Sequence, residues 1–157
     1  MVPAQKRMTY AEYLVFEEAS LEKHEFLDGE VYAMAGGTLE HGALAMAFGA
    51  ALMKALGDRP CRVFSSDVRV HIRATGLTTY PDLSVACGRA EVDAEDPDAL
   101  VNPVLLVEVL SDSTEAYDRA GRWELFEFER GAGCELASVD ATVRVDDVYR
   151  DPLSGVA

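Results

Sequence analysis

The chain has 157 residues, of which 49% are hydrophobic and 27% are charged. This length and composition predict one globular domain over residues 1–157 and exclude an intrinsically disordered chain. The formal net charge of −14 argues against a broad basic surface for nucleic acid or anionic lipid, although it leaves room for a local basic cleft.

The cysteine pattern and the lack of long apolar segments predict a cytoplasmic protein. The three cysteines, Cys61, Cys87 and Cys134, form no C-x-x-C pair, and an odd number gives no complete disulfide framework. We therefore expect three reduced thiols and no structural zinc site. No window approaches the roughly 18–20 apolar residues of a membrane span, and the first residues lack the apolar core of a signal peptide.

The N-terminal region predicts a short helix followed by a β-hairpin. Thr9 and Glu12 match the capping-box pattern, in which each side chain bonds the backbone of the other residue, so a helix should run to about Glu18. Asp28-Gly29 lies between two apolar runs and is typical of a tight type I′ turn, because both of its residues tolerate positive φ. Two antiparallel strands are therefore expected on either side of this turn.

A long apolar helix is expected next. Thr38 is suited to cap its start, and Gly57 is suited to end it after about Leu56. Residues 43–53 are almost entirely apolar and rich in alanine, which predicts a helix that is buried on most sides and packed closely on a sheet. His41 lies in the polar first turn of this helix.

Strands dominate the middle of the chain. Residues 61–64 and 68–72 have strand patterns. The stretch 80–87 contains an apolar strand, and Asp82 is the acid that opens it. The segment 88–102 is expected to be a solvated acidic loop, because its acids lack the spacing of a calcium-binding loop. These acids are Glu91, Asp93, Glu95, Asp96 and Asp98.

The last third of the chain predicts another strand, a helix and two weak strands. The apolar run 104–110 predicts a strand buried on both faces, although Glu108 interrupts it. A helix from about 113 to 129 should follow, because apolar residues recur there at helical spacing. The weak strands span about Cys134–Val139 and Val143–Tyr149. This order of elements predicts an α+β fold with a mixed sheet and few helices.

Asp82 and Glu108 are the most informative pair of charged residues. Each interrupts an apolar strand, where a carboxylate is costly to bury unless something binds it. If the two strands are neighbours, the two carboxylates could converge and bind a hard divalent cation. Alternatively, each carboxylate caps the end of a strand or pairs with an arginine.

Four sequence features occur in an order that is more specific than any one of them. They are FLDGEVYAM at 26–34, His41 at the start of the long helix, YPDLSV at 80–85 and NPVLLVEVLSDSTEAYDR at 102–119. Together they resemble a large bacterial family of restriction-endonuclease-like proteins in the PD-(D/E)XK nuclease superfamily. The resemblance covers about residues 8–150. It implies a mixed central sheet flanked by helices, with an N-terminal helix and β-hairpin.

The resemblance also implies Mg²⁺-dependent hydrolysis of DNA, with Mn²⁺ as a substitute ion. Asp82, Glu108 and the backbone carbonyl of Val109 would bind the metal, which would activate water and neutralise charge on the scissile phosphate. Glu30 and His41 match positions that the family usually keeps, and either could reach the metal or its waters; alternatively, both are surface residues. A homodimer is expected of nucleases that cut both strands. We expect no membrane partner.

The sequence departs from the family pattern at the position of the catalytic lysine. This lysine would fall at Leu110, which has neither a charge nor a proton to transfer. Arg122, in the next predicted helix, could hold the phosphate instead, although its pKa above about 12 makes it a poor base. Alternatively, Arg122 pairs with Asp118 at i,i+4 spacing on a solvated helix face.

Two other functions stay open at this point. The first is a homo-oligomeric module that kept the fold and lost catalysis. It is compatible with Leu110 and Arg122 at the lysine positions, with the charge of −14, and with a C-terminus that we expect to be short for the family. The acidic composition also suits a metal-dependent hydrolase of a small phosphorylated substrate better than it suits an enzyme that binds duplex DNA.

Overall fold

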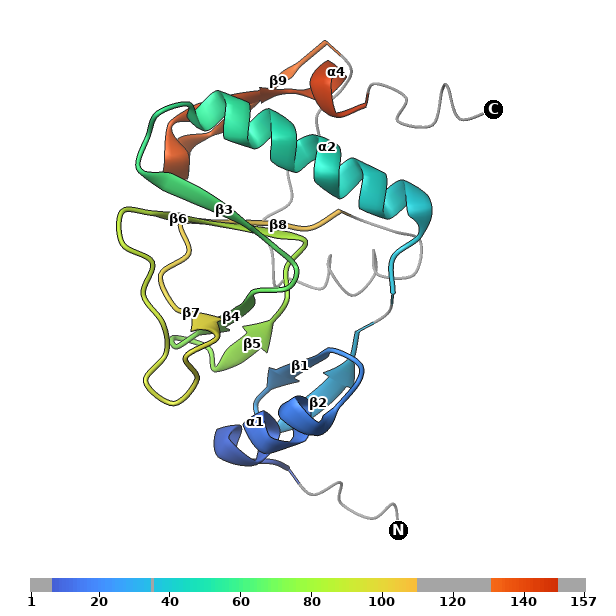
Figure 1. Cartoon of the computed structure of the whole chain (residues 1–157), viewed down its shortest axis with the longest axis vertical. Helices are drawn as coiled ribbons and strands as arrows, with labels where there is room; N and C mark the ends of the chain where they lie inside the picture. The colour runs from blue at the N-terminus through green and yellow to red at the C-terminus, as the bar shows by residue number, and fades with distance from the viewer. Residues whose placement is uncertain (1–6, 35, 110–130, 150–157) are drawn as a thin grey trace.

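A computed structural model describes residues 7–34, 36–109 and 131–149 of the chain (Figure 1). The helices in this part are α1 (Tyr10–Ala19), α2 (Leu39–Leu56) and α4 (Val145–Val148), with a 3-10 turn at Ala137–Val139. The strands are β1 (His24–Leu27), β2 (Glu30–Ala33), β3 (Cys61–Ser65), β4 (Arg69–Ile72), β5 (Leu77–Thr79), β6 (Leu83–Cys87), β7 (Ala99–Leu100), β8 (Leu105–Val107), β9 (Gly133–Leu136) and β10 (Ala141–Arg144). The predicted helix at 113–129 lies outside the described residues.

The strands form two sheets and a hairpin. A five-stranded sheet has the order β2-β1-β5-β4-β7 and is mixed, because β4 and β7 run parallel while the other pairs are antiparallel. A three-stranded antiparallel sheet has the order β3-β6-β8, and β9 pairs with β10. Figure 1 shows α2 lying across β3 and β6, with α1 beside the β1–β2 hairpin. This arrangement confirms the predicted α+β class with a mixed sheet and flanking helices.

The predicted N-terminal helix and hairpin are both present. The Thr9 side chain accepts a hydrogen bond from the backbone N–H of Glu12 at 3.2 Å, and the Glu12 carboxylate accepts one from the N–H of Thr9 at 2.8 Å. This is the predicted capping box, and α1 begins at the next residue. In the hairpin turn, Asp28 and Gly29 have φ values of 56° and 86°, which are the positive values that a type I′ turn requires.

Helix α2 begins and ends where the sequence predicts, but less of it is buried than we expected. The Thr38 hydroxyl accepts from the N–H of His41 at 3.1 Å, and Gly57 ends the helix with a φ of 57°. Its buried residues are Gly49, Leu52 and Leu56. The prediction of burial on most sides is therefore wrong, because the described strands and α4 cover only part of the helix circumference.

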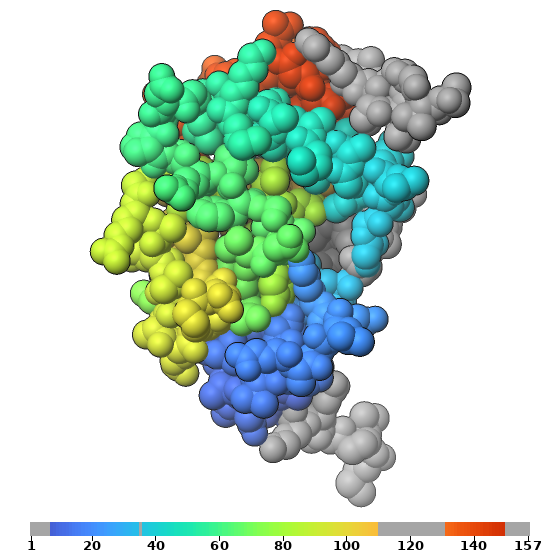
Figure 2. Space-filling model, viewed as in Figure 1, coloured from blue at the N-terminus to red at the C-terminus, as the bar shows by residue number. Residues whose placement is uncertain are grey.

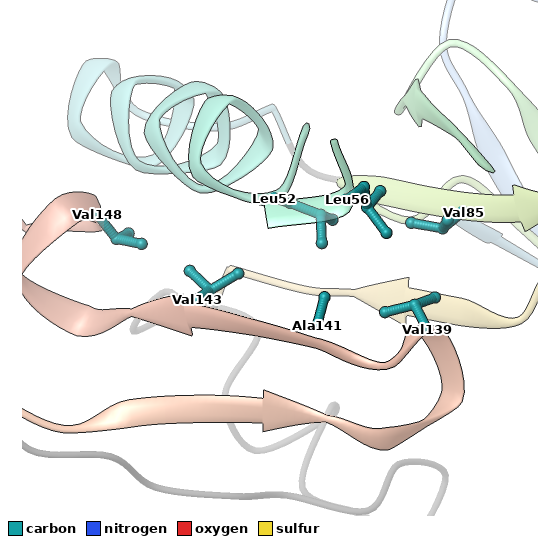
Figure 3. Close-up of a cluster of buried hydrophobic side chains, with 7 residues drawn as sticks. All are labelled: Leu52, Leu56, Val85, Val139, Ala141, Val143 and Val148. Atoms are coloured by element: carbon teal, nitrogen blue, oxygen red, sulfur yellow. The ribbon is translucent and has the colours of Figure 1, made fainter. Parts of the chain in front are cut away.

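The core lies between α2, the three-stranded sheet and the C-terminal hairpin. Leu52 and Leu56 of α2 pack against Val85 of β6 on one side and against Ala141 and Val143 of β10 on the other (Figure 3). Leu52, Val85 and Val143 are at most 2% exposed. The small residues of α2 permit this close approach, as we predicted. A Cβ atom at Gly49 would lie 3.4 Å from a methyl group of Leu83, so little space is left there.

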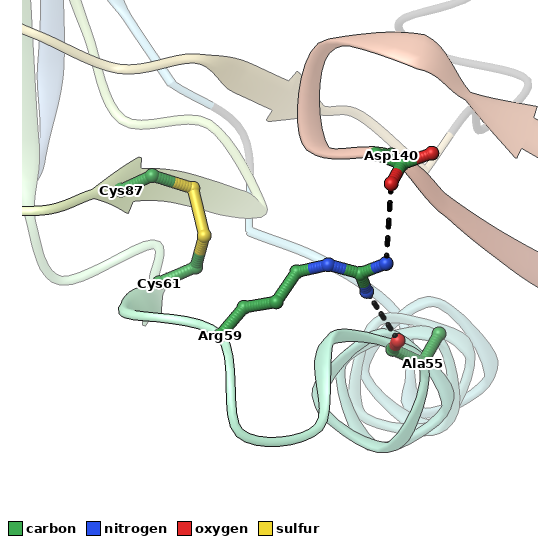
Figure 4. The surroundings of a disulfide bond; sticks show 5 residues. All are labelled: Ala55, Arg59, Cys61, Cys87 and Asp140. Atoms are coloured by element: carbon green, nitrogen blue, oxygen red, sulfur yellow. Dashed lines mark hydrogen bonds and ion pairs between the residues drawn. A yellow bond between two sulfur atoms is a disulfide. The ribbon is translucent and has the colours of Figure 1, made fainter.

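A disulfide between Cys61 and Cys87 corrects the prediction of three reduced thiols. The two residues lie directly opposite each other in the β3–β6 ladder, and their sulfur atoms are bonded (Figure 4). Among the described residues, only Cys134 is a free cysteine. The 26-residue separation gave no indication of this pairing, which depends on the register of two strands.

The acidic segment after β6 is also less solvated than we predicted. Asp96 is only 4% exposed and forms an ion pair with Arg69 of β4. The backbone N–H of Glu95 donates to the Asp93 carboxylate at 2.9 Å, and this hydrogen bond, together with one from Nε of Arg73 at 3.2 Å, lowers the pKa of the Asp93 carboxyl. The predicted solvated loop is therefore wrong for these two acids, because arginines in and directly after β4 bind them.

The predictions for three strands also need correction. The sequence did not identify β5 as a separate strand and placed β7 within the predicted loop 88–102, because strands of three and two residues carry too little alternation to detect. The last weak strand was predicted at Val143–Tyr149, but β10 ends at Arg144 and the next four residues form α4. Within the described ranges, none of the helices combines the length and apolarity that crossing a membrane requires.

Buried tyrosines are expected to make the fold sensitive to alkaline pH. Burial is the main cause that raises the pKa of Tyr10 and of Tyr80 from 10.0 to about 12. The unfolded chain therefore releases these two protons at lower pH than the folded chain does. Their contribution to stability is intact below pH 10 and is lost as the pH rises through about 12.

A spectroscopic titration of phenolate absorbance, followed in parallel with circular dichroism, measures this effect. We expect part of the phenolate signal to appear only near pH 12, as the fold is lost, and we expect Tyr80→Phe to remove about one tyrosine from that late phase. Complete ionisation of all tyrosines near pH 10 with the fold intact would contradict the prediction.

Candidate functional site

The strands next to Asp82 and Glu108 are neighbours, which is the condition on which the sequence argument for converging carboxylates depended. Strands β6 and β8 pair antiparallel, with Leu83 opposite Val107 at the end of the ladder. Extending this register by one residue brings Asp82 opposite Glu108. Strand β8 is shorter and more exposed than expected, because all three of its residues are only partly buried. Both carboxylates therefore lie at the end of a strand pair and not within a fully buried strand.

Two groups from different elements contact the Asp82 carboxylate. Its Oδ2 accepts a hydrogen bond from the backbone N–H of Val109 at 2.7 Å. The same oxygen lies 3.1 Å from Nε2 of His41, in the first turn of α2. The side chains of His41 and Asp82 are 21% and 15% exposed, so the pair is shielded from solvent but still accessible to a small ligand.

Glu30, another candidate residue, has its described contacts elsewhere. Glu30 makes its described contacts within the N-terminal region, where one carboxylate oxygen lies 3.9 Å from Nη2 of Arg7 and the other accepts from the hydroxyl of Tyr32. Its side chain is 51% exposed. Leu110 and Arg122 lie outside the described residues.

The donor atoms at this site fit a hard divalent cation. The carboxylates of Asp82 and Glu108 and the backbone carbonyl of Val109 are oxygen donors, which Mg²⁺ prefers. In the parts of the chain that the structure describes, no three side chains of histidine, cysteine, aspartate or glutamate come together as a metal-binding group. Mg²⁺ sites in proteins usually contain one or two carboxylates and several waters.

A buried polar network that the sequence did not reveal lies next to the site. The Tyr80 hydroxyl accepts from Nε of Arg69 at 2.8 Å and donates to the Glu17 carboxylate at 2.9 Å. Glu17 also contacts Nδ1 of His24 at 2.9 Å, so the network joins α1, β1 and β4. Tyr80 is two residues before Asp82, and the network thus fixes the segment that leads into β6.

Sequence reasoning missed this network because its members are far apart in the chain. Glu17 and Tyr80 are 63 residues apart, and neither lies in a motif that predicts the contact. The only available signal was Arg69, a cation that alternates with apolar residues in a strand and therefore needs a partner when that strand is covered.

Known proteins resemble the chain in sequence and in fold. The family model described as "Putative restriction endonuclease" (Uma2) matches residues 10–152. The chain is 38% identical to the uncharacterized protein slr1290 of Synechocystis over 120 residues, which are 76% of this chain and 62% of that protein. It is 35% identical to the uncharacterized protein sll1609 of Synechocystis over 119 residues, which are 76% of this chain and 67% of that protein. The chain thus spans less than two thirds of slr1290.

A solved structure confirms the predicted fold type. The crystal structure of a putative nuclease belonging to DUF820 from Anabaena variabilis superposes with a TM-score of 0.68 at 16% sequence identity. The match covers 90% of this chain and 97% of the other, so the likeness extends over nearly the whole fold. With the family match over residues 10–152, these findings establish that the chain belongs to the Uma2 family, whose members are described as putative restriction endonucleases.

Proposed function

We propose that this protein is a Mg²⁺-dependent endonuclease that hydrolyses phosphodiester bonds in DNA. The observation that carries the proposal is the β6–β8 pairing, which brings Asp82 and Glu108 to neighbouring positions at the end of two strands. The hydrogen bond that the N–H of Val109 donates to Asp82 brings the backbone of Val109 beside the first proposed ligand. The description of the family and the name of the structural neighbour support the same activity.

Each residue of the site has a distinct role in this proposal. The two carboxylates and the Val109 carbonyl hold the ion, which supplies neutralisation of the phosphate and activation of a water molecule. His41 and the N–H of Val109 both contact Oδ2 of Asp82, so they fix the orientation of that carboxylate. Without a cation, the carboxylates would repel a phosphate group.

The proposal also needs a positive group that contacts the phosphate. Leu110 cannot provide it, since its side chain is apolar. We assign this role to Arg122, whose planar guanidinium can bind two phosphate oxygens at once. Arg122 remains charged at all physiological pH values and therefore stabilises charge without acting as the base. Water bound to the metal ion would then be the source of the nucleophile.

A second candidate function is hydrolysis of a small phosphorylated substrate by the same metal site. The net charge of −14 favours it, because a long DNA duplex meets more repulsion from an acidic protein than a small ester does. A catalytically inactive homo-oligomeric module is the remaining alternative. It predicts that Arg122→Lys leaves the protein without any activity, whereas an active nuclease should keep at least part of its activity in this variant.

Metal binding and cleavage measured together test the proposed function. We expect calorimetry to show binding of Mg²⁺ and Mn²⁺, and we expect cleavage of plasmid and single-stranded DNA that stops when EDTA is added. A protein that binds neither ion and cuts neither DNA would contradict the proposal. Metal-dependent hydrolysis of a small phosphodiester, without salt-sensitive DNA binding, would instead favour the second candidate.

A further inference from the structure

Helix α2 carries an exposed apolar stripe along its outer face. Leu39, Met46 and Met53 are 87%, 70% and 55% exposed and recur every seven residues. The residues between them on this face, Gly42 and Ala50, are also exposed and are small. Figure 2 shows α2, from cyan to green, lying open across this face of the molecule.

The stripe is separate from the core-facing side of the same helix. Leu52 and Leu56 face the core, and the described elements that pack on α2 include β3, β6, β10 and α4. Large apolar side chains that are aligned on one helix, with no charged residue between them, are typical of a surface that another helix covers.

The spacing of the stripe makes it complementary to a second copy of itself. Leu39 and Met53 are each seven residues from Met46, on either side of it. Seven residues make nearly two full helical turns, so the three side chains lie on nearly the same face. If two copies of α2 pack antiparallel about a two-fold axis through Met46, each Leu39 therefore meets the Met53 of the partner copy. Gly42 and Ala50 allow the two helices to approach closely, as small residues do in other helix pairs.

Charged residues beside the stripe favour the antiparallel arrangement. Glu40 and Lys54 are both exposed and lie on the same flank of the stripe, fourteen residues apart. This separation is about 21 Å along the helix axis, too far for an ion pair within one copy. In the antiparallel pair, Glu40 of one copy lies beside Lys54 of the other, so two opposite-charge pairs form. A parallel pair would leave Glu40 of one copy and Lys54 of the other about 21 Å apart.

We propose that this face of α2 is the docking surface for a second copy of the chain, in an antiparallel two-fold dimer centred on Met46. The inference concerns assembly and does not depend on the proposed nuclease activity. The sequence led us to expect a homodimer but not its interface, and this inference supplies a surface for it. His41 contacts Asp82, the residue before β6, and α2 packs on β6 through Gly49 and Leu52, which lie off the stripe, so this dimer does not use the side of α2 that faces the candidate site.

Sedimentation velocity of the full chain over a concentration series tests the proposal. We expect the wild-type protein to be dimeric. We expect Met46→Glu to raise the dissociation constant of the dimer by at least about a hundredfold, because the two copies of the introduced carboxylate would meet, buried, at the two-fold axis. Val15→Glu is the matched control, since Val15 is also 70% exposed on a helix. Both variants introduce glutamate, which is a good helix former, and circular dichroism checks that each variant is folded. A monomeric wild-type protein, or an unchanged Met46→Glu dimer, would overturn the proposal.

Cysteine cross-linking tests the direction of the two helices independently. In a Cys134→Ser background, Met46→Cys is expected to form an intermolecular disulfide on oxidation, because two copies of this residue meet at the axis. Leu39→Cys is the control: its two copies are about 21 Å apart in the antiparallel dimer, far beyond disulfide range. Equal cross-linking at both positions would indicate a parallel pair and would overturn the antiparallel arrangement.

Discussion

Replacement of Asp82 by asparagine is expected to lower the rate of metal-dependent DNA cleavage by at least about a hundredfold, the scale of losing a group that stabilises developing charge. The amide oxygen of asparagine can still accept the hydrogen bond that Val109 donates to Asp82, so the end of β6 should keep its position. What the variant loses is the negative charge that binds the cation. Calorimetry should therefore show weaker Mg²⁺ binding, with the melting temperature in the absence of metal little changed.

Asp67→Asn is the matched control for this variant. Asp67 is 84% exposed and pairs with Lys23, outside the candidate site, so its replacement should leave both metal binding and cleavage unchanged. Glu108→Gln should reproduce the loss seen for Asp82→Asn, because the proposal gives both carboxylates the same role. Full cleavage by Asp82→Asn would exclude the β6–β8 site as the catalytic centre. An equal loss in Asp67→Asn would point to a general effect of charge.

The parts of the fold that the sequence predicted well are those that local physics determines. The capping box at Thr9, the Asp28-Gly29 turn and the Thr38 and Gly57 ends of α2 depend on residues close together in the chain. Each is set by a backbone group that a nearby side chain satisfies, or by a φ value that few residues adopt. The choice of Asp82 and Glu108 as candidate residues also came from a local signal, since each disrupts an apolar pattern.

The parts that were missed depend on strand register and on contacts between distant residues. No local pattern could pair Cys61 with Cys87, because their contact follows from the register of β3 and β6. The same holds for Asp96, which looked like one of several solvated acids until the fold brought Arg69 to it. Burial of the α2 surface was overestimated for a related reason: an apolar composition does not distinguish a core face from a face that another chain can cover.

Replacement of Asp96 by asparagine is expected to cost about 3–5 kcal/mol of stability, because it leaves the Arg69 guanidinium without its charged partner in a buried environment. The side chains of Arg69 and Asp96 are only 12% and 5% exposed, so water cannot readily replace the carboxylate. Arg69 also donates to the hydroxyl of Tyr80, and this bond alone cannot balance a full positive charge. Urea unfolding at neutral pH measures the loss as a lower free energy of unfolding.

The exposed Lys23–Asp67 pair provides the comparison that separates burial from simple pairing. Its N–O distance is 2.8 Å, but both side chains are largely in contact with water, at 42% and 84% exposure. Asp67→Asn should therefore cost less than about 1 kcal/mol, since solvent screens the charge that remains. If Asp96→Asn cost no more than this control, the Arg69 charge would have another stabilising partner. A large difference between the two variants would instead show that the Arg69–Asp96 pair, in addition to the β4–β7 pairing, anchors the acidic segment to β4.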